Sequence, residues 1–443
     1  MPKRSKTLTI RGGRVIDPAN DVDAMTDLHI AGPRILALGD APADFSAERV
    51  IDAEGLIVCP GLVDLCARLR QPGQEQKATI ASETRAAAAA GITTLCCPPD
   101  TLPPVDTPAV AQLIRRIADE RGFARVLPAG GLTQGLEGIQ ISEMAALQRA
   151  GCPVMSNADR PIRNTRVQRR ALEYASTYGL TAFLHPADAY LSEGGLVHEG
   201  LLSTRLGLPG IPEAAETVAV ARDLALAEQT GARIHFRGLS TARATEMLAE
   251  ARARGIRVTA DVSAHQLFMT EHDLTGFNAQ AHVIPPLRTL ADRDALRAAL
   301  AAGEIAAICS DHQPHEPDAK LDPFPQTESG ISGLETLLPL ALRLVREGVL
   351  ELAAVLACLT CNSARILGLP LGRLQTSTSA DVCIFDPEAR WVPGPNTLLS
   401  RGHNTPFLGV EMTGRVEWTL LAGRITFQRV DDSSVSISRP QAI

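Results

Sequence analysis

An expected apolar strand leads into a polar loop in the stretch Pro60-Gly61-Leu62-Val63-Asp64-Leu65-Cys66-Ala67-Arg68-Leu69-Arg70-Gln71-Pro72-Gly73. The apolar run before it ends in Pro60-Gly61, a strand is expected over Leu62–Leu69, and a loop follows at Gln71-Pro72-Gly73. Cys66 and Arg68 stand two residues apart, so their side chains point to the same face of the strand. Two imidazoles at this spacing would grip a metal ion, but a guanidinium group has no lone pair to offer and keeps its charge. Whether this chain holds a metal is therefore the first question that the sequence raises.

Seven more apolar runs follow this strand, and segments of helical character separate them. Eight strands with intervening helices predict a closed parallel (β/α)8 barrel of the TIM type. The strands are expected at Leu62–Leu69, Thr93–Cys97, Arg125–Ala129, Val154–Asn157, Thr181–His185, Arg233–Arg237, Arg257–Val262 and Ile305–Ser310.

Both flanks of the barrel differ from it in sequence pattern, because they contain short expected strands separated by turn residues. The N-terminal flank contains Thr7-Leu8-Thr9-Ile10 and Leu28–Leu38, and the C-terminal flank contains Val382–Phe385 and Val416–Leu420. Because neither flank has enough apolar surface alone, we expect one small β domain built from both termini. The predicted domains are residues 1–60 and 371–443 for the β domain and 61–370 for the barrel.

Composition excludes several classes of function. The chain has 443 residues, of which 45% are hydrophobic and 21% charged, and its net charge of −7 does not favour nucleic acid or an anionic membrane surface. We expect no membrane span and no export signal, because the N-terminal segment has no sufficiently long apolar run. The nine cysteines are then expected to be reduced, in a cytoplasmic protein.

Several motifs resemble those of the dihydroorotase family in the amidohydrolase superfamily. They include Arg70-Gln71-Pro72-Gly73, Gly207-Leu208-Pro209-Gly210-Ile211-Pro212, Pro285-Pro286-Leu287-Arg288, Ser310-Asp311-His312-Gln313-Pro314-His315 and Asn404-Thr405-Pro406-Phe407. The resemblance covers nearly the whole chain. It implies an amidohydrolase barrel with its site at the C-terminal ends of the strands.

The same resemblance implies that most metal ligands have been replaced. The six ligand positions of the family correspond here to Cys66, Arg68, Asn157, His185, Gly238 and Asp311. Only His185 and Asp311 keep the family's residue types. A catalytic zinc needs about three protein ligands, and without it an attacking water keeps a pKa of roughly 15.7 rather than about 7. We therefore expect no cofactor and no catalytic residue, with Asp311 a vestige of the family's proton shuttle.

The substrate contacts implied by the resemblance are also mixed. Arg70 corresponds to the family's carboxylate-binding arginine and His315 to a further substrate contact, so both are kept. Asp100 and Ile284 stand where the family has asparagines. Asp100 would repel an anionic substrate, and Ile284 removes a hydrogen-bond partner.

Two interpretations of the altered metal site stay open. Arg68 could replace the lost cation and pair with Asp311. Alternatively, Cys66, His185 and Asp311 could form a rebuilt zinc site. Asp64 and Asp159 are interpreted as loop and turn carboxylates, and His235, His265, His282 and His312 as structural histidines.

Three functional hypotheses follow. The first is a non-catalytic dihydroorotase-like protein of pyrimidine biosynthesis; the resemblance implies that its partner is the catalytic chain of aspartate carbamoyltransferase, and that it forms a homo-oligomer. The second is an active metal-dependent cyclic amidohydrolase with the rebuilt site. The third is a metal-free sensor that binds an anionic metabolite through Arg70 and His315.

Overall fold

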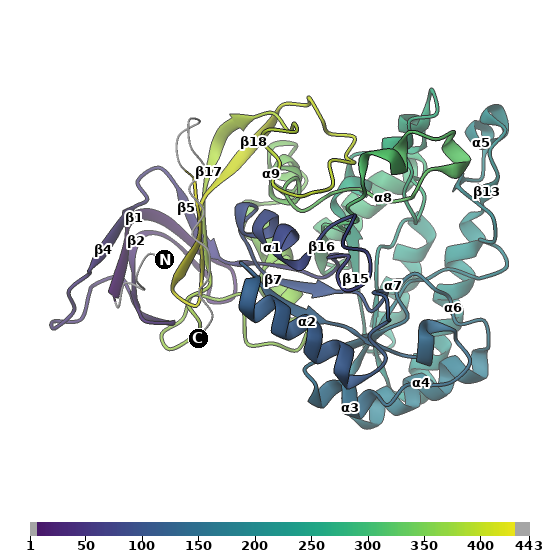
Figure 1. Ribbon diagram of the computed structural model, residues 1–443, viewed down its shortest axis with the longest axis horizontal. Coiled ribbons are helices and arrows are strands. Elements are labelled where there is room, and N and C mark those ends of the chain that lie inside the picture. The colour runs from purple at the N-terminus through teal and green to yellow at the C-terminus, as the bar shows by residue number, and fades with distance from the viewer. Residues whose placement is uncertain (1–6, 430–443) are drawn as a thin grey trace.

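The computed structural model describes residues 7–429 and contains a barrel and a separate β sheet. Figure 1 shows the sheet at one end of an elongated molecule and the barrel, with its helices, at the other. The hydrophobic clusters broadly follow this division: the largest packs barrel strands against helices and extends to the neighbouring face of the sheet, the second fills the β domain, and a third fills the inside of the barrel.

All eight predicted barrel strands are present. The first three pair in parallel in one sheet and the other five in a second, and β9 (Gly130–Gly131) continues the third strand and pairs in parallel with the fourth. The eight strands are β6 (Leu62–Asp64), β7 (Ile92–Cys97), β8 (Arg125–Pro128), β10 (Val154–Ser156), β11 (Thr181–Leu184), β14 (Arg233–Phe236), β15 (Val258–Ser263) and β16 (Ala307–Cys309).

The ring closes through the chain beyond β6 rather than through β6 itself. The predicted strand Leu62–Leu69 is regular only to Asp64. Beyond it, Ala67 forms an isolated parallel bridge with His312, and the Arg68 amide donates to the His312 carbonyl at 2.9 Å. The segment that carries Cys66, Arg68 and Arg70 is therefore held by a few specific hydrogen bonds at the mouth of the barrel.

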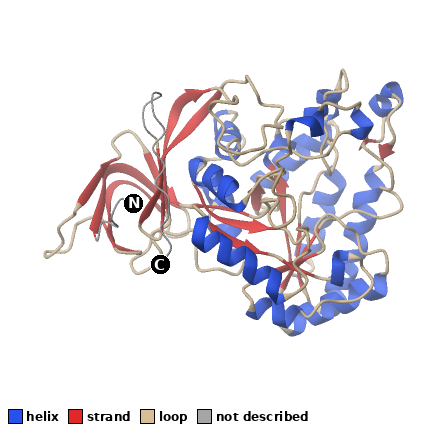
Figure 2. Cartoon of the chain, in the orientation of Figure 1, coloured by secondary structure: helices blue, strands red, loops and turns tan. Residues whose placement is uncertain are grey.

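Helices cover the outside of the barrel (Figure 2). Threonine side chains cap several of their N-termini; Thr79, for example, accepts a hydrogen bond from the Ser82 amide at 3.1 Å. The helices are α1 (Ile80–Ala89), α2 (Pro108–Arg121), α3 (Met144–Arg149), α4 (Thr165–Thr177), α6 (Glu213–Thr230), α7 (Ala242–Ala253), α8 (Leu290–Ala301), α9 (Leu337–Arg346), α10 (Leu352–Leu359) and α11 (Cys361–Ile366).

Shorter elements lie in the loops. The connection from β11 to α6 carries a small lobe made of β12 (Val197–His198), α5 (Leu201–Leu206) and β13 (Gly210–Ile211). The 3-10 helices are η1 (Gln134–Leu136), η2 (Ala264–Leu267), η3 (Glu271–Leu274), η4 (Ala279–Ala281), η5 (Pro317–Lys320) and η6 (Phe324–Gln326).

The β domain is one sheet built from both ends of the chain, which confirms the prediction. Its main path runs β19-β18-β17-β5-β1-β2-β3, and β4 pairs with β1. The central strand β5 pairs in parallel with β1 and antiparallel with β17. The strands are β1 (Thr7–Asp17), β2 (Val22–Ala31), β3 (Arg34–Leu38), β4 (Arg49–Asp52), β5 (Ile57–Pro60), β17 (Val382–Trp391), β18 (Met412–Leu421) and β19 (Arg424–Gln428).

Polar contacts fasten the β domain to the barrel. Arg125, the first residue of β8, forms an ion pair with Asp381 at 2.9 Å, and Asp381 also accepts the Ala422 amide at 2.8 Å. The Thr419 hydroxyl of β18 donates to the Ala88 carbonyl of α1 at 2.6 Å. None of the helices formed by residues 7–429 is long and apolar enough to cross a membrane.

Gly91 is one of the close contacts between the two parts, and it generates a prediction. Gly91 has φ of +80°, and a Cβ there would overlap the Cys383 sulfur of β17. We expect Gly91→Ala to destabilise the protein clearly more than the roughly 1–2 kcal/mol due to left-handed strain alone. Gly303→Ala is the matched control, because Gly303 has φ of +71° and no atom within 4 Å of the added carbon. Urea unfolding of both variants checks this; equal losses would contradict it.

Candidate functional site

The C-terminal ends of the barrel strands bring most of the predicted site residues to one mouth. They arrive on different segments, each directly following a strand, as expected for a barrel of this type. The predicted residues are Cys66, Arg68 and Arg70 after β6, Asp100 after β7, Asn157 after β10, His185 after β11, Gly238 after β14, and Asp311 and His315 after β16. Asp159 after β10 and Arg237 after β14, which were not predicted as site residues, lie at the same mouth.

The guanidinium group of Arg68 lies among three carboxylates. Its Nε atom donates to Asp100 at 2.7 Å, and its Nη1 atom lies 3.4 Å from Asp311. Its Nη2 atom donates to Asp159. The side chain of Arg68 is only 4% exposed, so these pairs lie largely out of water. The predicted pairing of Arg68 with Asp311 is present, and two further carboxylates join it.

Arg237 is a second buried arginine at the same mouth. Its Nη2 atom lies 2.9 Å from the Cys66 sulfur, 3.4 Å from Asp159 and 3.7 Å from Asp311. Its Nε and Nη1 atoms have no hydrogen-bond partner among residues 7–429. From the sequence, Arg237 is expected only as the end of a strand. One signal of a functional role was available: Arg237 stands two residues after His235 and places a charged side chain at the end of an expected buried strand.

The pKa values at the mouth reflect these ion pairs. Burial alone would lower the pKa of Arg68, but Asp100 and Asp159 outweigh burial and raise that pKa well above its usual value. Burial alone would raise the pKa of Asp159, but Arg68 and Arg237 hold it below the usual range. Both groups are therefore charged at neutral pH.

The residues of the mouth do not fit a metal ion. The Cys66 thiol is fully buried, and burial raises its pKa well above the usual value, which disfavours the thiolate that binds zinc. Arg237 and Asp311 are its polar contacts, at 2.9 and 3.3 Å. Within the described part of the chain, no group of three or more His, Cys, Asp or Glu residues could hold a metal.

Two positions at which the family resemblance implies metal ligands hold neighbouring loops and turns in this chain. The Asn157 side chain accepts from the Thr133 hydroxyl at 2.7 Å and donates to the carbonyls of Leu136 and Arg160. Gly238 has φ of +62°, where a histidine would be strained, and its amide donates to Asp261 at 2.6 Å. Asn157 thus holds the neighbouring loops, and Gly238 provides a turn.

His185 is half-buried near Asp159 and Arg237, and none of the described residues makes a hydrogen bond with its ring. Burial lowers its pKa, despite the opposing effect of Asp159, so the imidazole is neutral at pH 7. A neutral ring without a fixed partner is free to accept or donate one hydrogen bond to a bound molecule.

Arg70 and His315 lie together beside the ion-pair cluster. Lys77 donates to Nδ1 of His315 at 3.2 Å, which leaves the ring proton on Nε2, where it is donated to the Ser329 carbonyl at 2.9 Å. Arg70 Nη2 is 3.1 Å from the same Nε2 and donates no hydrogen bond to it in this tautomer. Burial and the two nearby cations lower the pKa of His315 to about 2, so the ring is neutral.

Several expectations about single residues need correction. Asp159 lies in the turn after β10 as expected, but its carboxylate also pairs with both arginines. Asp64 is not in a loop: it ends β6, is fully buried, and accepts the Ser310 amide at 2.9 Å. Asp100 is neutralised in part by Arg68, so its repulsion of an anion is weaker than expected. Ile284 is half-buried and brings no polar group to the mouth.

The single histidines are mostly fixed in structural pairs. His235 contacts Asp261 at 3.1 Å, His312 contacts Glu83 at 2.8 Å, and His282 contacts the Thr327 hydroxyl at 2.8 Å. His265 differs, because its buried ring makes no hydrogen bond with the described residues; burial lowers its pKa to about 4.

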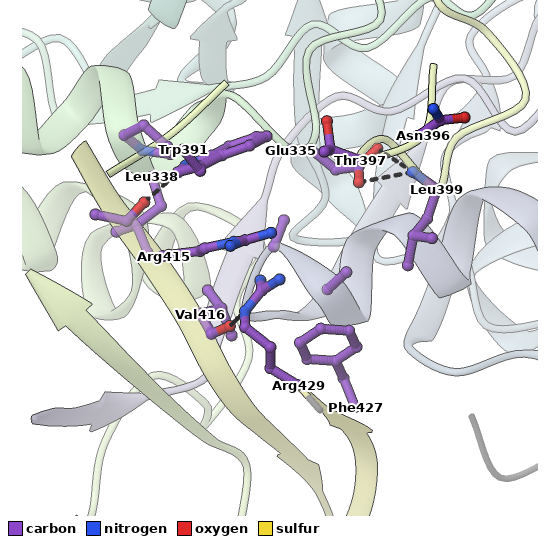
Figure 3. A pocket seen from close by; sticks show the side chains of 14 residues that line it. Glu335, Leu338, Trp391, Asn396, Thr397, Leu399, Arg415, Val416, Phe427 and Arg429 are labelled. Carbon is purple, nitrogen blue, oxygen red and sulfur yellow. Dashed lines mark hydrogen bonds between the residues drawn. The ribbon is translucent and has the colours of Figure 1, made fainter. Parts of the chain in front are cut away.

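A separate pocket of about 130 Å3 lies where β17 and β18 meet α1 and α9 (Figure 3). Its buried acid, Glu335, accepts the amides of Leu399 and Ser400 at 2.8 and 3.1 Å, and burial raises its pKa to about 7. Trp391 donates to the Gly414 carbonyl at 3.1 Å. Glu335 thus fastens the loop after β17 to the barrel, away from the mouth.

Comparisons with known proteins agree with the barrel and its motifs. Residues 55–244 match a family model described as dihydro-orotase-like. A "Dihydroorotase-like protein" of Pseudomonas aeruginosa is 52% identical over 422 residues, covering 95% of this chain and all of that protein. A "Dihydroorotase" of Geobacter sp. strain M21 is 43% identical, covering 95% and 99%. In fold, the L-hydantoinase of Arthrobacter aurescens superposes with a TM-score of 0.87 at 22% identity, over 98% of both chains.

The ion pairs of Arg68 yield a stability prediction. Arg68→Met leaves Asp100 without its ion pair and Asp159 and Asp311 with Arg237 alone, and we expect a loss of about 3–5 kcal/mol in the free energy of unfolding. Arg163→Met is the control, because Arg163 forms an exposed pair with Glu193 and should change stability by less than about 1 kcal/mol. The triple variant Arg68→Met/Asp100→Asn/Asp311→Asn should recover part of the loss. Urea unfolding measures the stability of all three variants. An Arg68→Met variant as stable as the parent would contradict the stabilising role of these ion pairs.

The lowered pKa of Asp159 predicts a dependence on pH. A carboxyl whose folded pKa lies below its unfolded value of about 3.9 stabilises the fold above that pH and loses this contribution as the pH falls. Asp159→Asn should be less stable than the parent by about 3 kcal/mol at pH 7. The difference should shrink between pH 5 and pH 3. Unfolding at pH 7, 5 and 3 tests this, with the exposed Asp119→Asn as control; a constant difference would be the contrary result.

Proposed function

Because the chain belongs to the dihydroorotase-like family, we propose that it is a non-catalytic member of that family. Its role is structural: it acts in pyrimidine biosynthesis in the cytoplasm, as the partner of the catalytic chain of aspartate carbamoyltransferase. The observation that carries the loss of catalysis is the buried cluster at the mouth, where Arg68 and Arg237 hold Asp159 and Asp311.

The cluster supports this proposal through simple electrostatics. Two guanidinium groups occupy the space beside the carboxylates, and a divalent cation placed there would be repelled by both. Asn157 and Gly238 supply no metal ligand, since the Asn157 amide is hydrogen-bonded to the Thr133 hydroxyl and two backbone carbonyls and Gly238 has no side chain. Without a metal, a water molecule at this mouth is not activated for attack on a cyclic amide.

The Cys66 thiol does not replace the missing nucleophile. It is fully buried and shares its sulfur contacts with Arg237 and Asp311. The adjacent guanidinium favours a thiolate, but burial outweighs it and keeps the pKa of Cys66 raised. A protonated thiol is a poor nucleophile, so this mouth lacks a group for covalent catalysis as well.

The partner follows from the family resemblance rather than from a particular residue. Barrel and β domain are both intact, so the chain keeps a complete scaffold on which another protein could assemble. We expect the chain to be a homo-oligomer within such an assembly, and to need no cofactor for it.

A second candidate function has one specific observation in its favour. The Nε and Nη1 atoms of Arg237 are buried without partners in the described chain, and His185 offers a neutral ring nearby. These groups, with Arg70 and His315, suit a metal-free sensor of an anionic metabolite. An active hydrolase with zinc on Cys66, His185 and Asp311 is less well supported, because Arg237 lies against two of the three.

One set of measurements tests the proposal. The chain is co-expressed with an aspartate carbamoyltransferase catalytic chain in zinc-supplemented medium, and the purified material is assayed for both enzyme activities and for zinc. We expect co-elution, an increase in carbamoyltransferase activity, less than about 0.1 zinc per chain and no turnover of dihydroorotate.

His185→Ala is the discriminating variant, because it removes a family ligand without breaking an ion pair. It should leave carbamoyltransferase activation nearly unchanged. Stoichiometric zinc with turnover that His185→Ala abolishes would establish the hydrolase instead. Saturable binding of dihydroorotate or carbamoyl-aspartate without turnover or co-elution would favour the sensor.

A further inference from the structure

A pocket lined by arginine side chains lies at the opposite end of the barrel from the mouth. It has a volume of about 310 Å3 and lies at the N-terminal ends of β11, β14 and β15. Its floor is apolar and includes the buried side chains of Ile234, Ile256 and Val258. Four exposed arginines stand around it: Arg233, Arg252, Arg257 and Arg365.

The positive charge of this pocket is not balanced by acidic side chains. No acidic side chain of the described chain forms an ion pair with any of the four, and none lines the pocket. Elsewhere on the surface, arginines are commonly paired, as Arg14 is with Asp23 and Arg169 with Glu173. An unbalanced cluster is unusual in a chain whose net charge is −7.

Helix ends account for only part of this cluster. Arg233 donates to the Gly179 carbonyl just beyond α4, and Arg252 donates to the carbonyls of Gly303 and Glu304 beyond α8, at 2.8 and 3.0 Å. Each helix C-terminus carries about half a negative charge, which leaves most of the arginine charge uncompensated. Arg257 and Arg365 form no side-chain hydrogen bond with the described residues, so helix capping does not explain them.

We propose that this pocket binds a small phosphorylated ligand that carries at least two phosphate groups. Guanidinium groups match phosphate oxygens in geometry and charge, and four of them around one hollow suit a di- or triphosphate better than a single anion. The volume lies at the lower end of the range for small-molecule pockets. An acidic polypeptide would need a longer groove, so the compact shape favours the small ligand.

The ligand would bind independently of the mouth. The pocket lies at the starts of the strands and the ion-pair cluster beyond their ends, so the two sites share strands but no side chains. The inference therefore does not depend on whether the mouth is catalytic.

Isothermal titration of the full chain with inorganic tripolyphosphate tests the proposal. We expect saturable binding near one ligand per chain, weakened as sodium chloride is raised because charge pairs are screened. Arg257→Gln/Arg365→Gln should weaken binding by at least about tenfold, in line with the loss of two charge-assisted contacts. This pair is chosen because its side chains hold no other described group, so the fold should be unaffected; thermal unfolding checks that.

Arg11→Gln/Arg390→Gln is the matched control, since both arginines are exposed on the β domain far from the pocket. It should bind tripolyphosphate as the parent does. A nucleoside triphosphate that binds more tightly than tripolyphosphate would identify a nucleotide as the source of the phosphates, and equal affinity would identify a polyphosphate chain. An equal loss of tripolyphosphate affinity in both double variants would overturn the proposal. Binding of poly-glutamate without binding of tripolyphosphate would also overturn it.

Discussion

The guanidinium group of Arg68 joins segments that follow three different barrel strands. Through Asp100, Asp159 and Asp311 it connects the ends of β7, β10 and β16 to its own segment after β6. A cation this well enclosed is costly to bury and is stable only with its partners in place. Arg237 adds a second link to two of the same carboxylates. The shape of the mouth therefore depends on charges supplied by the chain itself.

Much of the fold was predictable because its signals are local. Apolar runs of strand length, turn residues and helical segments gave all eight barrel strands, and the β texture of both flanks gave the composite sheet. The strand after Pro60-Gly61 was predicted too long, because beyond Asp64 the chain is held by isolated contacts such as Ala67 with His312 rather than by a regular ladder. Sequence patterns do not distinguish a regular strand from an extended segment that is held by isolated contacts.

The site was predictable in part, for a different reason. Arg68 and Gly238 differ from the residues that the dihydroorotase resemblance implies at these positions. The pairing of Arg68 with Asp311 follows from their opposite charges. The role of Arg237 was not predictable because its partners, Cys66, Asp159 and Asp311, follow other strands. The role of Asp159 was not predictable because nothing local separates a turn carboxylate from an ion-pair partner. The four arginines around the far pocket come from β14, α7, α11 and the residue before β15, and only the folded barrel brings them together.

The sheet made from both ends of the chain has a consequence for the order of synthesis. On the ribosome, β1 to β5 emerge first, but β5 cannot pair with β17 until the whole barrel between them has been translated. Until then β5 leaves one side of its backbone unpaired, which is the kind of edge that invites pairing with another chain. Completion of this domain therefore comes after synthesis of the barrel, and the nascent protein is most exposed to wrong partners while its barrel is being made.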